Sequence, residues 1–161
     1  MYKIKFNQSS LDIDICESVI KIFNIYKQRK VHDTEKGGIL MGKLYPSSNK
    51  IVITHAIICH NQESTRYGLN LNTKCLQEKM LEIWKESNGT ITYLGDWHTH
   101  PEKDPKPSIT DYKTFILNYF SSKFDQNILL YIIVSNTEKN WCKSFNGLLF
   151  KKETVKYSVS K

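Results

Sequence analysis

Residues 91–122 constrain the fold more than any other part of this chain, because they combine three kinds of local structure in a fixed order. The segment ITYLGDW at 91–97 is rich in β-branched and aromatic residues and predicts a strand. The next segment, PEKDPKP, carries prolines at positions 101, 105 and 107, which favour an extended crossing and disfavour a helix just before each proline. Helical spacing then begins at Ser108 and predicts a helix over 108–122, with apolar positions at Tyr112, Phe115, Ile116 and Tyr119.

The junction between this strand and this helix is a candidate metal site. A strand that runs into His98 and His100 places both imidazoles on one face, because strand side chains alternate. Asp111 lies in the first turn of the predicted helix and can point back at the histidines. Zinc sites that catalyse hydrolysis typically use three protein ligands and leave a fourth position for water, whereas structural sites use four protein ligands. No fourth ligand is visible in the sequence, so the pattern favours a catalytic Zn²⁺ site.

The same residues also have interpretations without chemistry. Ser108 and Asp111 satisfy the capping-box pattern, in which a serine and an acidic residue three positions later mark a helix start. An isolated His-x-His pair is weak evidence for a metal, but the four-residue spacing is specific. Cys59 and His60 are a tempting second metal pair, yet adjacent strand residues point to opposite faces, which disfavours a second zinc site.

The four-residue spacing resembles the JAMM signature of the MPN-plus metalloproteases: His-x-His, seven residues, Ser, two residues, Asp. His98, His100, Ser108 and Asp111 match it completely. The family also places a glutamate upstream, before two glycines and an apolar strand, and the segment EKGGILMG beginning at Glu35 fits that pattern. Without the resemblance, Glu35 is typical of an exposed turn residue. The segments GDWHTHPE and PSITD are similar to the small bacterial branch that accompanies antiphage operons of the CBASS type.

The resemblance implies a role for each of these residues. Zn²⁺ held by His98, His100 and Asp111 would lower the pKa of its bound water toward about 7. Glu35 is expected to accept the water proton and pass it to the departing amine. Ser108 is expected to donate a hydrogen bond to the oxyanion, where loss of one donor costs roughly 3–4 kcal/mol in barrier. The sequence leaves open whether Asp96 or another acceptor orients the imidazoles.

The activity implied is that of a zinc isopeptidase or peptidase that cleaves a ubiquitin-like or nucleotidyltransferase C-terminal conjugate from target amines. Its partner would be a protein substrate with an extended C-terminal tail, and the loop over 61–72 is one candidate to grip that tail. Three alternatives stay open: a peptidase that processes a sulfur-carrier or ubiquitin-like protein, a non-catalytic MPN scaffold, and a nucleic-acid-associated protein related to RadC. The scaffold is disfavoured because such members typically lack a metal ligand.

The composition is typical of one globular domain. With 161 residues, 40% hydrophobic and 24% charged, the chain can bury one core, and we expect a single domain over 1–161 with 153–161 as a loose or edge-pairing tail. No 18-residue apolar run and no basic-then-apolar N-terminal segment is present, so we expect a cytoplasmic protein without a membrane partner. The four cysteines form no Cys-x-x-Cys unit and are expected to be reduced: Cys16, Cys59, Cys75 and Cys142.

The net charge of +7 reflects 23 Lys+Arg against 16 Asp+Glu and raises attraction to acidic partners. The basic residues are spread along the chain without an arginine-rich block, which disfavours nucleic acid as a partner. The sequence does not determine the oligomeric state.

The remaining pattern predicts an α/β fold with one mixed sheet flanked by helices, in agreement with the deaminase-like MPN domain that the resemblance implies. Strands are expected over 2–6, 38–44, 50–58, 128–134 and 140–150, with the second and third forming a hairpin. Helices are expected over 73–87, ending at Asn88-Gly89, and over 10–28, with a stripe of Ile15, Val19, Ile22, Phe23 and Tyr26. Gly37 and Gly38 are expected to let the backbone kink where Glu35 approaches the metal.

Overall fold

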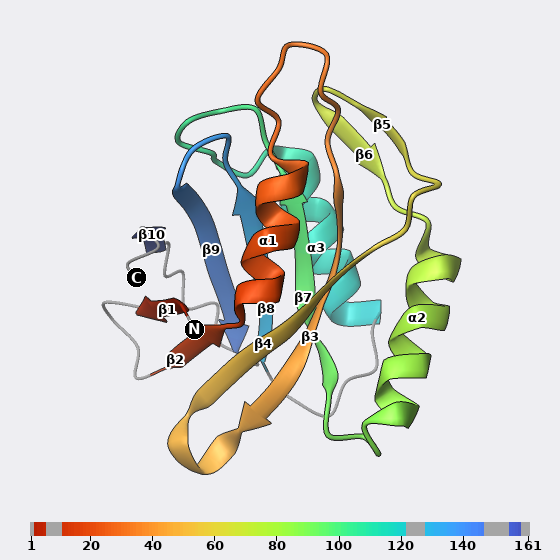
Figure 1. Cartoon of the computed structure of the whole chain (residues 1–161), viewed down its shortest axis with the longest axis vertical. Coiled ribbons are helices and arrows are strands. Elements are labelled where there is room, and N and C mark those ends of the chain that lie inside the picture. Colours follow the sequence, from red (N-terminus) through yellow and green to blue (C-terminus); the bar gives the residue numbers. More distant parts are fainter. Residues whose placement is uncertain (1, 6–10, 122–127, 147–154, 159–161) are drawn as a thin grey trace.

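The computed structural model describes residues 2–5, 11–121, 128–146 and 155–158, which form one large sheet, a small hairpin and three α-helices (Figure 1). The helices are α1 (Glu17–Tyr26), α2 (Thr73–Glu86) and α3 (Ile109–Ser121), and a 3₁₀ turn η1 covers Pro46–Ser48. The strands are β1 (Tyr2–Lys5), β2 (Asp12–Ile15), β3 (Gly37–Tyr45), β4 (Lys50–Ile58), β5 (Glu63–Thr65), β6 (Gly68–Asn70), β7 (Thr92–Thr99), β8 (Ile128–Val134), β9 (Lys139–Asn146) and β10 (Val155–Ser158).

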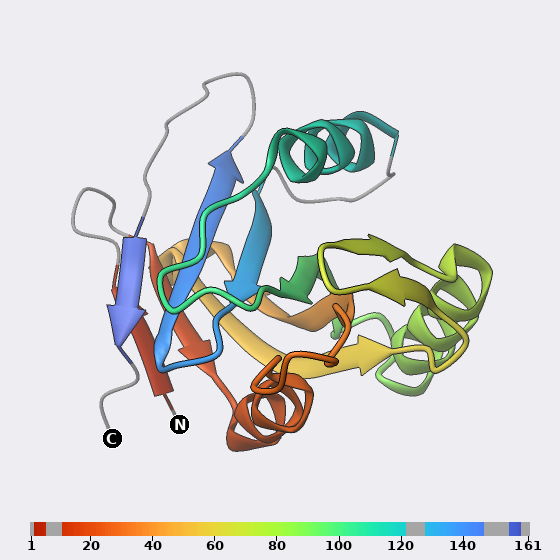
Figure 2. The same ribbon diagram turned by 90° about the horizontal axis from the view of Figure 1, so that it is seen from above.

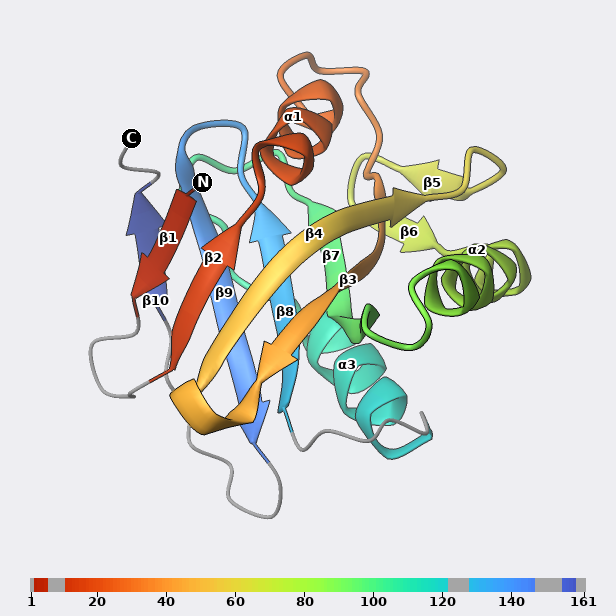
Figure 3. The same cartoon turned by 60° about the horizontal axis from the view of Figure 1, so that its bottom comes forward.

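The large sheet has eight strands in the order β1-β2-β4-β3-β7-β8-β9-β10, and β5 pairs with β6 as a separate hairpin. Two pairs are parallel, β2 with β4 and β7 with β8, and the other neighbours are antiparallel. The sheet curls until β1 and β10 lie side by side (Figures 2 and 3). The predicted α/β class with one mixed sheet flanked by helices is confirmed. That all of 1–161 forms a single domain stays a prediction.

Helices cover both faces of the sheet. Strand β8 is apolar throughout because it is buried on both of these faces. Alternate residues of β8 pack into the cluster that contains Phe23 of α1, and the intervening residues pack with Phe115 of α3. The first set is Leu130, Ile132 and Val134, and the second is Leu129, Tyr131 and Ile133. A strand buried on both faces has no polar side to present, as the sequence predicts. On the α3 side of the sheet, Leu76 of α2 closes a third cluster with Ile39 and Met41 of β3.

The predicted helix over 10–28 is wrong in its first half. Residues 12–15 form β2, which pairs with both β1 and β4, and only Glu17–Tyr26 are helical. Ile15 belongs to the core as the predicted stripe requires, but it enters from a strand opposite Ile53. A four-residue alternation is too short to compete with helical spacing in a sequence, and its pairing partners lie far along the chain. Residue 10 lies outside the described residues.

The other predicted elements agree with the structure within a few residues. The β3–β4 hairpin turns through η1 and Asn49, whose φ is +48°. Helix α2 ends at Glu86, and the chain leaves it through Asn88 and Gly89, both with positive φ, which is a common helix exit. In the expected tail, 155–158 form β10 and pair with the edge of β9. Positions 6, 122, 147–150, 153–154 and 159–161 of the expected elements lie outside the described residues.

The expected kink at Gly37 and Gly38 is wrong. Both glycines lie in β3, and neither has a positive φ. A Cβ on Gly37 would come within 2.6 Å of the Trp97 carbonyl oxygen and 2.8 Å of the His98 Cβ. Gly37 therefore lets β3 pack closely against the end of β7 rather than bending the chain.

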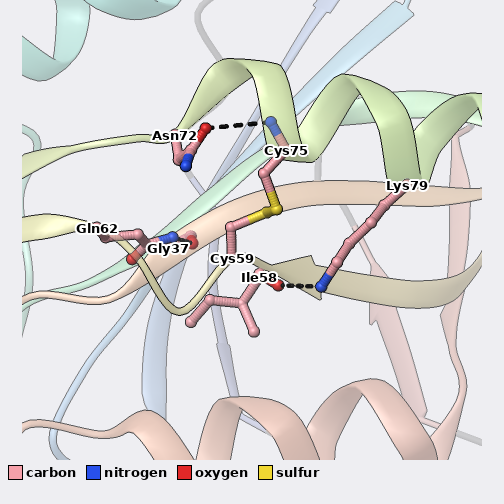
Figure 4. The surroundings of a disulfide bond; sticks show 7 residues. All are labelled: Gly37, Ile58, Cys59, Gln62, Asn72, Cys75 and Lys79. Carbon is pink, nitrogen blue, oxygen red and sulfur yellow. Dashed lines mark hydrogen bonds between the residues drawn. A yellow bond between two sulfur atoms is a disulfide. The ribbon is translucent and has the colours of Figure 1, made fainter.

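The expectation of four reduced cysteines is corrected by a disulfide between Cys59 and Cys75 (Figure 4). Cys59 follows β4 and Cys75 lies in the first turn of α2, so the bond joins the two ends of the segment that carries β5 and β6. Cys16 and Cys142 remain free thiols. A spacing of 16 residues does not by itself indicate a pair. The two Cα atoms come within 6.3 Å of each other only in the folded chain.

No helix in the described part of the chain has the length and apolar character needed to cross a membrane. The cytoplasmic location stays a prediction. A disulfide such as Cys59–Cys75 is more typical of oxidising compartments.

Candidate metal centre

The two motif histidines lie at the end of β7 and share one face, as predicted. His98 is near the end of the strand, His100 immediately follows it, and both are buried. Their Nε2 atoms are 2.8 Å apart, and their ring centroids are 4.7 Å apart. Trp97 points the other way, into the core against Phe23. Strand alternation therefore converges the two imidazoles on one point.

Asp111 completes the group from the first turn of α3. Its Oδ1 lies 3.4 Å from the His98 Nε2, and its Oδ2 lies 3.4 Å from the His100 Nε2. The ligand atoms of the three residues all lie within 4.8 Å of one another. Ligand atoms about 2.0–2.1 Å from a tetrahedral zinc ion are roughly 3.3 Å apart, so this donor set fits such an ion.

Ser108 and Asp111 also form the reciprocal capping box. The backbone N–H of Ser108 donates to Asp111 Oδ2 over 2.7 Å, and the backbone N–H of Asp111 donates to Ser108 Oγ over 3.1 Å. The capping interpretation and the chemical interpretation therefore hold together. The cap fixes the first turn of α3 and so aims the Asp111 carboxylate at the histidines.

Burial and the contacts among these three residues both shift their pKa values. Burial favours a neutral Asp111, but its hydrogen bonds with His100 and His98 hold its pKa well below the ordinary value. Burial lowers the pKa of His98 and favours the neutral imidazole. Burial acts in the same direction on His100, but the hydrogen bond and charge of Asp111 raise the pKa of that imidazole. An ionised Asp111 and a neutral His98 are the states in which these two side chains can ligate a cation.

Glu35 lies beside the histidines and is buried, with 6% of its surface exposed, so the interpretation as an exposed turn residue is wrong. Its Oε1 is 3.8 Å from the His100 Nε2. Burial raises the pKa of Glu35 to about 7, against the lowering effect of His100. Its backbone N–H donates to the Thr65 carbonyl in β5 over 2.8 Å. The structure thus brings together all five residues that the sequence singled out.

Several neighbours were not identified from the sequence. The Nδ1 of His100 faces Glu102 Oε2 at 3.3 Å, a contact that orients the imidazole from behind. The ring of Tyr131 lies 5.3 Å from that of His98 and stacks on Phe115 at 4.7 Å. The only available signal for Glu102 was its place two residues after His100. Tyr131 sits inside an apolar run on a distant strand and gave no signal.

Asp96, whose role the sequence left open, joins β7 to α3. It accepts hydrogen bonds from the Tyr93 hydroxyl over 2.8 Å and the Asn118 amide over 2.9 Å. Burial raises its pKa, although both hydrogen bonds act to lower it. Asp96 therefore holds the strand of the histidines against the helix of Asp111.

Comparison with known proteins gives consistent relatives. Residues 24–146 match the family described as prokaryotic homologs of the JAB domain. A protein named CD-NTase/cGAS isopeptidase from Escherichia coli (strain TW11681) is 36% identical over 111 residues, which are 68% of this chain and 69% of that protein. A protein of the same name from Vibrio cholerae is 31% identical over 114 residues, 67% of each chain. A probable metalloprotease, y4qB, from Sinorhizobium fredii is 33% identical over 99 residues, 60% of this chain and 59% of that protein.

Among solved structures, the solution structure of protein DSY2949 from Desulfitobacterium hafniense matches with a TM-score of 0.61. It covers 92% of this chain and 91% of that one at 19% identity, so the likeness concerns the fold alone.

Proposed function

Because the chain belongs to the family of prokaryotic JAB-domain homologs, as its resemblance to the MPN-plus metalloproteases indicated, we propose that it is a zinc-dependent isopeptidase or peptidase. The proposed reaction releases a nucleotidyltransferase or ubiquitin-like C-terminal tail from a target amine, in a bacterial antiphage system of the CBASS type. The observation that carries the proposal is the gathering of three ligand atoms within 4.8 Å, beside a buried carboxylate 3.8 Å from one of them.

His98, His100 and Asp111 are the residues that would hold the ion. Zinc in such a site lowers the pKa of a water molecule to about 7 and polarises a carbonyl oxygen. The contact between Glu102 and the Nδ1 of His100 favours the tautomer in which Nε2 carries the lone pair. The lone pair of the His100 Nε2 is therefore directed at the proposed metal position.

Glu35 is the proposed general base. A base works best when its pKa lies near the working pH, and burial raises the pKa of Glu35 to about 7. The carboxylate accepts the proton of the attacking water and transfers it to the departing amine. Its backbone is fixed by β5, so the carboxylate is held beside the histidines before substrate arrives.

Ser108 is the proposed donor to the oxyanion. Its Oγ accepts the backbone N–H of Asp111, and a hydroxyl that accepts one bond can still donate its own hydrogen. The side chain lies at the helix N-terminus, where the dipole favours negative charge. Both features stabilise the charge that develops on the carbonyl oxygen in the transition state.

The substrate class rests on the relatives. Two of them are named CD-NTase/cGAS isopeptidase, and a third is named a metalloprotease. We therefore propose a protein substrate whose extended tail leads to the scissile bond, and a cytoplasmic site of action. Backbone pairing of that tail with an open strand would align the bond.

A cleavage assay tests the proposal. The zinc-loaded chain is mixed with a CD-NTase joined through its C-terminal carboxyl to a lysine ε-amine, and a ubiquitin-like fusion is tested in parallel. We expect release of the free tail, with loss of activity after chelation and recovery with zinc. His98→Ala should lose both bound zinc and turnover. Full activity in a metal-free preparation would overturn the zinc mechanism, and cleavage of the fusion alone would favour processing of a small carrier protein.

A further inference from the structure

Gln28 is a completely buried amide, with 1% of its surface exposed, two residues after the end of α1. Its Nε2 donates to the carbonyl oxygens of Asp33, over 3.2 Å, and Arg66, over 3.0 Å. Its Oε1 accepts the Thr99 hydroxyl over 3.1 Å. Carbonyl oxygens only accept, so these partners fix which end of the amide is the nitrogen. A buried amide with such partners holds three segments in one arrangement.

Thr99 lies between His98 and His100 and forms two hydrogen bonds with the backbone of Lys36, the residue after Glu35. Its Oγ1 accepts the backbone N–H of Lys36 over 3.0 Å, while its own N–H donates to the Lys36 carbonyl over 2.8 Å. Because Oγ1 gives its hydrogen to Gln28, the hydroxyl uses both its donor and an acceptor position. The strand of the histidines is thereby tied directly to the segment of the proposed base.

The opposite side of that segment is tied to the β5–β6 hairpin. The N–H of Glu35 donates to the Thr65 carbonyl over 2.8 Å, and the Arg66 guanidinium donates to the carbonyls of Lys30 and Val31. Gln28 reaches the Arg66 carbonyl, one residue from Thr65. The contacts close a ring that runs through Gln28, Thr99, Lys36, Glu35, Thr65 and Arg66.

From this ring we infer that Gln28 is a positioning residue for Glu35: it sets the backbone of the proposed base against the strand of the metal ligands. The inference rests on the proposed function. Gln28 itself bonds to Thr99, Asp33 and Arg66, and acts on the site only through them. The amide nitrogen of Gln28 is needed as a donor, because a carboxylate in its place would aim an oxygen at two carbonyl oxygens.

Gln28→Met tests the inference, because methionine keeps the length of the side chain and removes its hydrogen bonds. We expect about the wild-type zinc content and a KM within about twofold, with kcat lower by on the order of 10-fold to 100-fold, since small misplacements of a reacting group have that effect. Gln28→Glu should lower kcat at least as much. Gln77→Met makes the same change at an exposed position of α2 and should match wild type.

Thr99 supplies a second, independent pair of variants. Thr99→Val removes the hydroxyl and keeps the shape, so it should lower kcat as Gln28→Met does. Thr99→Ser keeps the hydroxyl and should restore kcat to within about threefold of wild type. If Gln28→Met does not fold, this pair decides. Equal kcat in the valine and serine variants would overturn the inference.

Amide hydrogen exchange separates this inference from the proposed function. The N–H groups of Glu35 and Lys36 should exchange at least about 10-fold faster in Gln28→Met than in wild type, while the Leu130 N–H in β8 should not change. This measurement needs no substrate. If wild type cleaves none of the conjugates, the proposed function fails and exchange alone decides the role of Gln28. Unchanged exchange at Lys36, or a fall in kcat accompanied by loss of zinc, would overturn it.

Discussion

Single residues at the candidate metal centre combine burial with charge, and Glu35 is the clearest case. A carboxylate with 6% of its surface exposed, 3.8 Å from an imidazole nitrogen, is kept there by backbone bonds on both sides. Its contribution to stability is unfavourable when it is charged, because burial penalises the charged form. The proposed role in proton transfer gives this buried carboxylate a function that its stability contribution does not.

Glu35→Gln should keep the zinc and lose turnover. Glutamine has the same shape as glutamate, so the ligand atoms stay in place, but the amide cannot accept and release a proton at neutral pH. General-base catalysis contributes about 10²- to 10⁴-fold, so a fall of that order is expected. Atomic emission measures whether zinc is kept, and the cleavage rate at saturating substrate measures whether turnover is lost. Normal hydrolysis by this variant would show that the base has been assigned wrongly.

Ser108→Ala should affect both stability and rate. Loss of the N-cap costs about 1 kcal/mol of unfolding free energy. Loss of an oxyanion donor lowers kcat by on the order of 10²- to 10³-fold.

Ser108→Gly separates the two effects. Glycine at an N-cap costs only a few tenths of a kcal/mol, roughly, so stability should stay near wild type while the rate falls as in the alanine variant. Urea unfolding measures the stability of the alanine and glycine variants, and single-turnover cleavage measures their rates. A rate equal to wild type in both variants would reduce Ser108 to a helix cap.

At the scale of elements, the segment between β4 and α2 is held at both of its ends. Figure 4 shows the disulfide beside two other contacts at this point: Asn72 caps the Cys75 N–H over 3.1 Å, and the Lys79 ammonium donates to the Ile58 carbonyl over 2.9 Å. Gln62 donates to the Gly37 carbonyl over 2.6 Å. The β5–β6 hairpin is therefore anchored both to α2 and to the strand that follows Glu35.

Removal of the disulfide should lower the free energy of unfolding. The bond joins residues separated by 16 positions, and closing a loop of about 15 residues stabilises by about 3 kcal/mol in the chain-entropy description. Urea unfolding with and without a dithiol reductant measures the difference. The double variant Cys59→Ser, Cys75→Ser is the control, because its midpoint should not respond to the reductant. A wild-type midpoint that is the same in both conditions would contradict the prediction.

Local signals explain which elements could be predicted from the sequence. The crossing over 101–107, the start of α3 at the capping box and the exit of α2 at Asn88-Gly89 are encoded by neighbouring residues, and all three agree with the structure. Strand β2 could not be separated from α1, because its four residues acquire strand character only by pairing with β1 and β4. The disulfide has the same origin, since residue spacing does not show which cysteines meet.

The cluster of His98, His100 and Asp111 could be predicted because the three residues lie within 14 positions of one another, 98 to 111. Glu35 required the family resemblance, because its contact with His100 crosses more than sixty residues of chain. Gln28 carries no motif at all. Its role appears only when α1, β7 and the β5–β6 hairpin are placed together, which is a property of the folded chain.

For the whole molecule, the metal should act as a stabilising ligand of the native state. The proposed ligand atoms come from the end of β7, the residue that follows it and α3, so only the folded chain brings them together. A ligand that binds only the native state adds about 2.7 kcal/mol to the free energy of unfolding at a concentration of 100 Kd. Thermal unfolding in excess zinc and in excess chelator measures the shift. His98→Ala should show nearly the same melting temperature in both, and a wild-type protein that does so would contradict the prediction.

The shared carboxylate of Asp111 has a kinetic consequence. The same side chain caps the start of α3 and faces both imidazoles. Fraying of that first helical turn would therefore withdraw one of the proposed ligands from a bound ion and let the ion dissociate. In the proposed enzyme, the residence time of zinc is governed by how often the end of one helix unwinds, so agents that promote fraying should speed metal exchange long before the protein melts.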